Sequence, residues 1–275
     1  MDFLLLAQVC ALGAAVGVLG SVFGLGGGIF AIPALVLYFH VPMHSAVALS
    51  LAAIIAASSS VASVNVGRGL ANMKLGLALE AFTVPGAALG AFAASRLDAK
   101  VLQLLFSLLL CGVSVVMARR ALRKTPDASA VCEPGALGGR YTDPATGKTV
   151  SYAVRHFPFA AAAAVGAGAL SGLLGVGGGI IKVPTMRLVC GVPLKAAAAT
   201  SNFMLGMTAA ASAAVYFSKG FLVADIGAAL VLGVLAGAAL GVRTLSGMKA
   251  ERLELAFAAL VLGIGVKMLL ATGVL

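Results

Sequence analysis

Apolar residues run along this chain in long blocks that are separated by short polar connections. Blocks close to the roughly 20 residues that a helix needs to cross hydrocarbon recur over most of the length. They lie at about residues 3–23, 45–66, 75–95, 101–118, 157–174, 196–217, 222–242 and 253–274. The pattern therefore predicts an all-α integral membrane protein with about eight transmembrane helices. The first block has no basic residues before it, so we expect a retained helix rather than a secretory signal.

Composition agrees with the hydrophobic pattern, because 61% of the 275 residues are hydrophobic and 10% are charged, against about 25% charged in soluble domains. The net charge of +10 would suggest nucleic acid binding in a soluble protein, but here the basic residues cluster at the ends of apolar blocks. The longest connection, residues 119–155, holds seven of them. Basic connections stay in the cytoplasm, so we expect a multi-pass protein of the cell inner membrane with a cytoplasmic linker. Eight spans would place both termini on that same side.

An internal repeat relates the two parts of the chain at a shift of 151 residues. Without a gap from residue 20 to residue 112, about a third of the aligned positions are identical. GLGGGIFAIP, ending at Pro33, aligns with GVGGGIIKVP, ending at Pro184. We therefore expect a first transmembrane repeat over residues 1–121, a linker over 122–153 and a second repeat over 154–275. Four full crossings in each repeat would make them parallel, whereas an odd number would invert them.

Each copy contains three consecutive glycines within its first apolar region. They are Gly26, Gly27 and Gly28 in the first copy, and Gly177, Gly178 and Gly179 in the second. Consecutive glycines favour non-helical backbone, and Pro33 and Pro184 lack an amide donor, so we expect a broken or re-entrant helix in each half. Irregular backbone at membrane depth is tolerated where it is buried in protein or lines a polar cavity.

Paired interruptions of this kind typically mark the binding site of a transporter. Glycine amides can converge on a ligand, and the start of the next helix segment adds unpaired N–H groups and a positive dipole end, which together favour an anion. The alternative is that the glycines only allow close helix crossing. A nucleotide site is disfavoured, because neither run completes GxGxxG and no GK[ST] follows.

Polar residues downstream of the glycines add candidate ligands. Ser45 and Ser50 lie in the first copy, and Thr200, Ser201 and Asn202 lie in the second. Their side chains either bind substrate or hydrogen-bond to neighbouring helices. Ser50 and Ser201 are the stronger pair, since they align between the copies.

Three charged residues break the symmetry of the repeat. Lys182 and Arg187 stand where the first copy has Ala31 and Val36. An intramembrane cation is costly without a partner, so either residue is a candidate counter-charge for an anion, or else extends to the membrane interface. Glu80 lies inside an apolar block, where it either carries a coupling proton or pairs with a nearby Lys or Arg.

No cofactor or metal is expected from the sequence. The four cysteines form no CxxC pair, and Pro42 between His40 and His44 argues for a turn rather than a helical metal pair. An intramembrane enzyme is disfavoured, because no HExxH, GxSxG or paired intramembrane aspartates are present. A passive anion channel remains as the alternative to a transporter, because broken helices build both.

The glycine motifs, the two repeats and the helix with Thr200, Ser201 and Asn202 resemble the sulfite exporter TauE/SafE family of bacterial membrane permeases. The resemblance covers nearly the whole chain outside the linker. It implies transport, often export, of sulfite, sulfonates or related organosulfur anions across the cytoplasmic membrane, without a cofactor. The expected partners are thus a small anion, a coupling proton or other ion, and the lipid bilayer.

Overall fold

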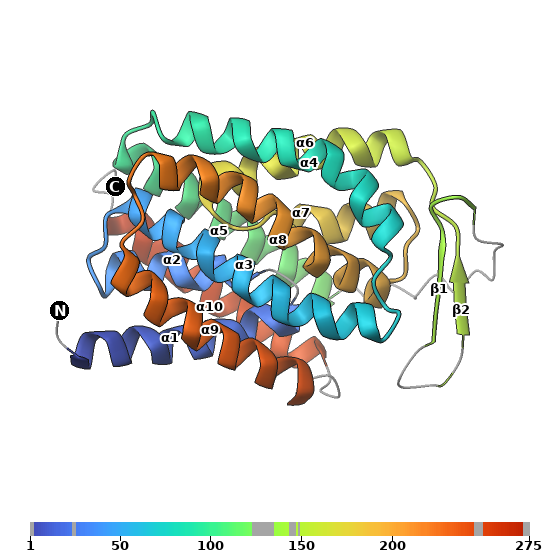
Figure 1. The fold of residues 1–275 in the computed structure, drawn as a ribbon, viewed down its shortest axis with the longest axis horizontal. Helices are drawn as coiled ribbons and strands as arrows, with labels where there is room; N and C mark the ends of the chain where they lie inside the picture. Colours follow the sequence, from blue (N-terminus) through green and yellow to red (C-terminus); the bar gives the residue numbers. More distant parts are fainter. Residues whose placement is uncertain are drawn as a thin grey trace.

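Long helices lie side by side in a bundle, with a short β-hairpin at one end (Figure 1). The structure is a computed structural model, and it describes residues 3–23, 26–122, 135–142, 147, 149–244 and 250–271. The elements are α1 (Phe3–Phe23), α2 (Gly28–Leu37), α3 (Met43–Gly67), α4 (Met73–Ala94), α5 (Ala99–Leu122), β1 (Gly139–Thr142), β2 (Thr149–Tyr152), α6 (Phe157–Leu174), α7 (Gly179–Pro184), the π-helix η1 (Thr185–Val189), α8 (Leu194–Ser218), α9 (Ala224–Thr244) and α10 (Ala250–Ala271).

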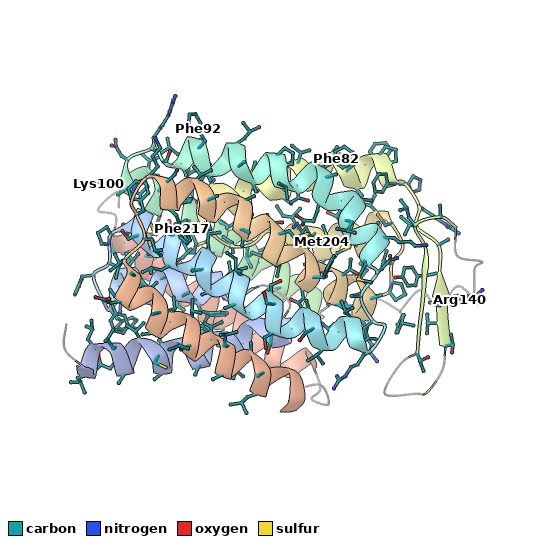
Figure 2. The ribbon with its side chains drawn as sticks, in the orientation of Figure 1. Phe82, Phe92, Lys100, Arg140, Met204 and Phe217 are labelled. Carbon is teal, nitrogen blue, oxygen red and sulfur yellow. The ribbon has the colours of Figure 1, made fainter. Side chains whose placement is uncertain are left out.

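The outer surface of the bundle is apolar, as expected for helices that face lipid. Large hydrophobic side chains are exposed on most of the long helices, among them Leu89, Phe159 and Leu232. Figure 2 shows Phe82 and Phe92 on the outer side of α4. The chain is therefore an all-α, multi-pass membrane protein. Six described helices, α1, α3, α4, α5, α6 and α9, are long and apolar enough to cross a membrane, fewer than the eight expected.

Two helix pairs pack closely and run parallel, and in both pairs glycines form the contact. In α1, Gly13 lies against Leu230 of α9, and the next turns of both helices continue the contact. In α4, Gly90 lies against Ala169 of α6 in the same way. The absence of a side chain lets the two backbones approach, which favours association where no hydrophobic force acts between helices in lipid. Each pair joins the N-terminal part of the chain to the C-terminal part.

The chain connections gather at the two ends of the bundle. At the hairpin end, Asn72 Nδ2 donates to Leu137 O at 2.9 Å, and Arg155 N donates to Cys190 O at 3.1 Å. At the other end, which we call the distal end, the His44 ring stacks on Phe221 with centroids 4.9 Å apart. Connections 38–42, 95–98 and 219–223 lie there. Lys100 and Arg140 mark the two ends in Figure 2.

Both terminal helices have their outer ends at the distal end, opposite the hairpin (Figure 1). α1 runs parallel to α9, which starts there. α10 runs antiparallel to α5, because Gln103 contacts Met268 and Ser114 contacts Ala258. The expectation that the termini share a side with the linker is therefore wrong. The first two helical segments of each half begin and end at the same end of the bundle: α1 begins and α2 ends at the distal end, and α6 begins and η1 ends at the hairpin end.

The hairpin packs against the end of the bundle at which α4 begins. β1 and β2 pair antiparallel, with Tyr141 opposite Val150. Asn72 caps α4 by accepting from Leu75 N at 3.0 Å, and its amide also reaches the hydroxyl of Tyr152 at 3.3 Å. Burial raises the pKa of Tyr152, so this hydroxyl stays protonated. The hairpin lies within the expected linker, whereas Cys132 and the basic residues Arg123, Lys124 and Lys148 lie outside the described residues.

Because the glycines differ in how closely they are packed, the loss of stability on adding a methyl group should depend on the position. A Cβ at Gly90 would fall on the carbonyl oxygen of Ala169, so we expect Gly90→Ala to lower stability by about 1 to 3 kcal/mol. Gly166, on the same helix pair, has open space around it, and Gly166→Ala is the control that should leave stability unchanged or slightly raised. Thermal unfolding in detergent compares them. Equal stability of the two variants would contradict the packing.

The arrangement of the ends predicts opposite accessibility for the hairpin and the connection 219–223. In a variant without native cysteines, Thr142→Cys and Lys219→Cys place one exposed thiol at each end. A membrane-impermeant maleimide should label only one of them in intact cells and both after permeabilisation. Labelling of both thiols in intact cells would show that the two ends share a side.

Candidate functional site

The predicted chain breaks lie at the glycines. Gly26 and Gly27 have φ angles of 73° and 78°, and Gly177 and Gly178 have φ angles of 78° and 74°. This left-handed conformation is readily available only to glycine. Gly27 and Gly178 then serve as the residues from which α2 and α7 start. The expectation of broken helices is confirmed in both halves.

The prolines do not break the helices as expected. α2 continues past Pro33 to Leu37, so in the first half the interruption lies at the glycines alone. Pro184 ends α7, and the chain continues without a gap as the π-helix η1, which contains the half-buried Arg187. The missing amide of a proline removes one helical hydrogen bond, and here the helix axis continues despite that loss.

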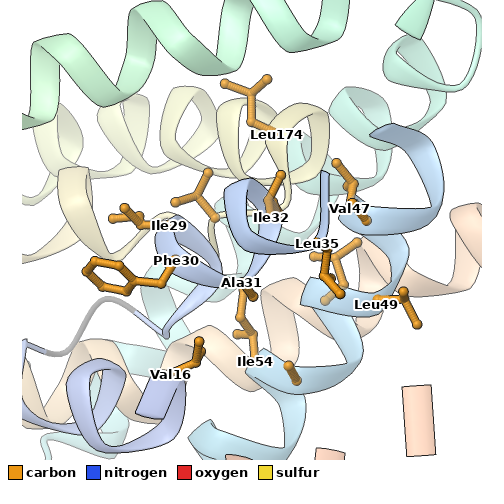
Figure 3. Packing of buried hydrophobic residues seen from close by; sticks show 14 of the residues in the cluster. Val16, Ile29, Phe30, Ala31, Ile32, Leu35, Val47, Leu49, Ile54 and Leu174 are labelled. Carbon is orange, nitrogen blue, oxygen red and sulfur yellow. The ribbon is translucent and has the colours of Figure 1, made fainter. Parts of the chain in front are cut away.

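α2 is buried on almost all sides, which explains how an irregular segment is tolerated. Ile29, Ile32 and Leu35 are at most 1% exposed, and Figure 3 shows them pointing to different sides of the helix. Val16 of α1 and Leu174 of α6 are part of the same cluster. The bundle therefore supplies the burial that broken backbone needs at membrane depth.

The two glycine breaks meet near the centre of the bundle. A Cβ at Gly26 would lie 3.2 Å from Ile54 and 3.4 Å from Leu205, and a Cβ at Gly177 would lie 3.4 Å from Ile54 and 2.7 Å from Leu205. Ile54 of α3 and Leu205 of α8 are themselves 151 residues apart. One apolar pair thus contacts both breaks. This pair was missed by sequence reasoning, which looked only for polar ligands.

Ser50 joins the two halves at the same level. Its hydroxyl donates to Gly175 O at 2.9 Å, and a Cβ at Gly28 would meet both of these oxygens. The aligned Ser201 is fully buried, and its hydroxyl has no hydrogen-bond partner. Ser171, against Gly178, is the other buried hydroxyl without a partner among the described residues. Two unsatisfied hydroxyls in a buried region are unusual and mark places where a polar ligand could be accommodated.

The other polar candidates on α8 have structural partners. Thr200 Oγ1 accepts from Asn72 N at 2.9 Å, which ties α8 to the start of α4 at the hairpin end. Asn202 accepts at its backbone oxygen from Ser58 Oγ, at 2.5 Å. Neither contact involves a glycine break. The structure therefore groups Ser50 with the breaks and assigns Thr200 a position nearer the hairpin.

Lys182 and Glu80 form a buried ion pair, one of the two alternatives that the sequence left for Glu80. Lys182 Nζ lies 2.6 Å from Glu80 Oε1, and the two side chains are 1% and 4% exposed. Thr208 lies between them, with its hydroxyl 2.5 Å from Nζ and 2.8 and 2.9 Å from the two carboxylate oxygens. Together with Thr208, the pair joins α4, α7 and α8. The positive charge of Lys182 is thus compensated in this conformation.

Thr208 was not among the residues singled out from the sequence, although a signal was present. At a shift of 151 its counterpart is Ala57, just as Ala31 corresponds to Lys182 and Val231 to Glu80. All three members of the cluster are polar in one copy and apolar in the other. Comparing the two copies at every position that is polar in one and apolar in the other would have identified Thr208.

A small cavity lies beside this cluster, between α6, α7 and α8. Lys182, Thr185, Ala164 and Met204 contribute to its lining. It has room for about one water molecule, so an oxyanion does not fit in this conformation. Entry of a larger ligand requires that α7 or α8 move.

Comparison with known proteins agrees with this architecture. Residues 9–268 match the family described as sulfite exporter TauE/SafE. The chain belongs to this family. It is also similar to a probable membrane transporter protein, YunE, of Bacillus subtilis (strain 168), at 27% identity over 248 residues that cover 88% of each chain. No solved structure matches it.

Membership of the TauE/SafE family makes this protein a membrane transporter of the permease type. The family is one of transporters rather than enzymes, in line with the sequence, and transport implies a small-molecule substrate. The glycine breaks, Ser50 and the Lys182 cluster are therefore candidate elements of a transport pathway.

The ion pair predicts a distinctive stability pattern. Lys182→Ala would leave the carboxylate of Glu80 buried without a counter-charge, so we expect a loss of about 3 to 5 kcal/mol in the free energy of unfolding. Adding Glu80→Val, the residue at the equivalent position of the other half, should recover most of that loss. Thermal unfolding in detergent measures both, with Lys219→Ala as an exposed control. A single variant as stable as the wild type would contradict the pairing.

Proposed function

We propose that this protein is a secondary transporter that exports small sulfur-containing anions, such as sulfite or organosulfonates, across the cytoplasmic membrane. The single observation that carries the proposal is the convergence of two glycine-broken segments, one from each half, on Ile54 and Leu205 at the centre of the bundle. The family description, which names sulfite export, supports the choice of substrate.

An anion is the ligand class favoured by the chemistry around the breaks. The start of α2 presents backbone N–H groups and the positive end of a ten-residue helix. Gly26, Gly27 and Gly28 bring no side chain that would block the approach of a ligand, and the same holds for Gly177, Gly178 and Gly179. Buried hydroxyls at Ser201 and Ser171 have unused hydrogen-bonding capacity. Lys182 adds a positive charge once its ion pair with Glu80 is broken. A tetrahedral or pyramidal oxyanion is suited to several donors that converge from different directions.

The proposed transport cycle rests on two inverted repeats. The shift of 151 residues pairs α1 with α6, α3 with α8 and α4 with α9, and the members of each pair run in opposite directions. In such transporters one repeat rocks against the other around a central site, so that access alternates between the two sides. In this conformation the apolar side chains of Ile54 and Leu205 lie against both breaks, and we assign it to an occluded state.

The hairpin end is proposed to face the cytoplasm, within the inner membrane. Residues 123–156 carry Arg123, Lys124, Arg140, Lys148 and Arg155, whereas the distal connections 38–42, 95–98 and 219–223 together carry two basic residues. The excess of basic residues identifies the cytoplasmic side. In the labelling experiment above, Lys219→Cys should therefore be the thiol that reacts in intact cells.

A passive channel is the second candidate, and flux measurements separate the two. A transporter gives saturable flux and accelerated exchange when unlabelled substrate is present on the opposite side, whereas a pore gives neither. The apolar side chains of Ile54 and Leu205 against both glycine breaks favour the transporter, because an open polar pore would need these side chains to be displaced.

Counterflow in proteoliposomes tests the proposed function. The purified protein is reconstituted with unlabelled sulfite inside, and uptake of labelled sulfite is competed with thiosulfate, sulfate, methanesulfonate and acetate. We expect saturable counterflow that sulfur oxyanions inhibit and acetate does not. Absence of counterflow with every sulfur anion, from protein that is folded in the vesicles, would contradict the proposal.

Gly178→Val and Gly27→Val test the glycine breaks. Valine at a positive φ angle is strained by about 1 to 3 kcal/mol, and the side chain would press on Ala167 O in one variant and on Val16 in the other. We expect counterflow to fall by about tenfold or more. Gly166→Val, in open space on α6, is the matched control. Full activity of both variants would assign the glycines to helix packing alone.

A further inference from the structure

Within the transporter proposed above, we infer that Glu80 is the proton-binding residue of the transport cycle, and that the anion takes the place of its carboxylate beside Lys182. The inference rests on the proposed function and specifies the coupling ion. It is carried by the geometry of the buried cluster, by the apolar residues at all three equivalent positions of the repeat and by charge balance.

The geometry allows an anion to replace the carboxylate of Glu80 as the partner of Lys182. Lys182 Nζ is held by Glu80 and by Thr208, and both are side chains rather than backbone groups. Thr208 Oγ1 lies within 2.9 Å of both carboxylate oxygens, so it can stay bonded to Glu80 whether the carboxyl is ionised or protonated. The Lys182 side chain also contributes to the lining of the small cavity between α6 and α7.

A purely structural role does not explain the cluster. The positions that the repeat makes equivalent are Ala31, Val231 and Ala57, and Ala31 and Ala57 are buried at 0% and 3% exposure. Apolar residues therefore fill this space adequately. A buried ion pair stabilises a fold no better than well-packed apolar residues and often less well. The polar residues at only one of the two equivalent places point to a role in the transport cycle rather than in packing.

Charge balance requires that binding of the anion be coupled to protonation of Glu80. In the observed conformation the ammonium of Lys182 and the carboxylate of Glu80 sum to zero. If a monovalent anion binds to the ammonium, the displaced carboxylate would remain as an uncompensated buried charge, which is strongly unfavourable. A proton that binds to the carboxylate removes that charge. One anion and one proton thus enter together, the site stays neutral, and no bond other than the new O–H is made.

No other titratable side chain competes for this role in the elements packed around Glu80. α6 carries none. On α8 the titratable residues are Lys195 and Tyr216, near its two ends, and on α7 and η1 they are Lys182 and Arg187. α4 itself adds Lys74 in its first turn. Among these groups, Glu80 is the acidic one.

The coupling also links binding to movement. The ion pair ties α7, the segment that follows the second glycine break, to α4 and α8. Since the cavity beside Lys182 has room for about one water molecule, α7 must shift before an anion fits. Protonation of Glu80 releases the ionic tie and so favours the shift. With one proton for each monovalent anion, transport is electroneutral, and its direction follows the concentration gradients of anion and proton.

Calorimetry on the purified full-length protein tests the inference. Methanesulfonate is the probe, because it stays ionised at all relevant pH values and any proton taken up is bound by the protein. Titrations in two buffers of different ionisation enthalpy give the number of protons taken up. For the wild type we expect about one proton for each anion, and an affinity that falls about tenfold for each unit of rising pH.

Two variants distinguish Glu80 from other groups. Glu80→Gln mimics the protonated carboxyl, so at a pH low enough to keep the unpaired Lys182 charged, binding should take up no proton and should not depend on pH. Asp225→Asn removes an exposed carboxylate from α9 and should behave as the wild type. If Glu80→Gln does not fold, the double variant Glu80→Val, Lys182→Ala installs the residues of the equivalent positions Val231 and Ala31, and it should bind at least tenfold more weakly without proton uptake.

The outcomes separate this inference from the proposed function. Binding by the wild type without proton uptake, or unchanged uptake in Glu80→Gln or in the double variant, overturns the coupling and leaves anion transport standing. Absence of binding with methanesulfonate, sulfite and sulfate alike contradicts the proposed function, and the coupling falls with it. Proton uptake that is lost in Glu80→Gln and kept in Asp225→Asn supports both.

Discussion

Lipid cannot satisfy backbone hydrogen bonds, and this constraint shapes the whole molecule. The two interruptions at Gly26–Gly27 and Gly177–Gly178 leave helix ends inside the apolar part of the bundle, where they must be enclosed by protein. Two close helix pairs, α1 with α9 and α4 with α6, provide that enclosure. Their contacts need glycines, because only bare backbone allows helices to approach so closely without hydrophobic force. Glycine therefore serves two purposes, close packing at the periphery and broken backbone at the centre.

The same enclosure excludes water from the Lys182–Glu80 pair and so strengthens the attraction between its charges. In a site from which water is excluded, the two charges are held together strongly, and neither can be left alone. Thr208 completes their hydrogen bonding and connects the pair to α8. Any movement of α7 must therefore exchange one partner of Lys182 for another. In the proposed cycle, protonation of Glu80 releases this contact before α7 moves.

The two halves contribute unequally to this arrangement. Ile54 and Leu205 occupy equivalent positions and contact both breaks, so the centre of the bundle is close to symmetric. The charged cluster has no counterpart at the equivalent place, because Ala31, Val231 and Ala57 occupy the positions that correspond to Lys182, Glu80 and Thr208. The ion pair joins a residue of each repeat, so in the proposed cycle protonation of Glu80 loosens a contact between the two repeats.

The sequence by itself determined the all-α membrane class, the repeat at 151 residues and the position of the breaks. These follow from local properties: hydrophobic length, identical spacing, and the conformational freedom of consecutive glycines. It did not determine that α2 continues through Pro33, that the termini lie opposite the hairpin, or that Thr208 joins Lys182 to Glu80. Each depends on which helices pack together, and 102 residues separate the members of the ion pair. Their contact exists only because tertiary packing brings α4, α7 and α8 to one point.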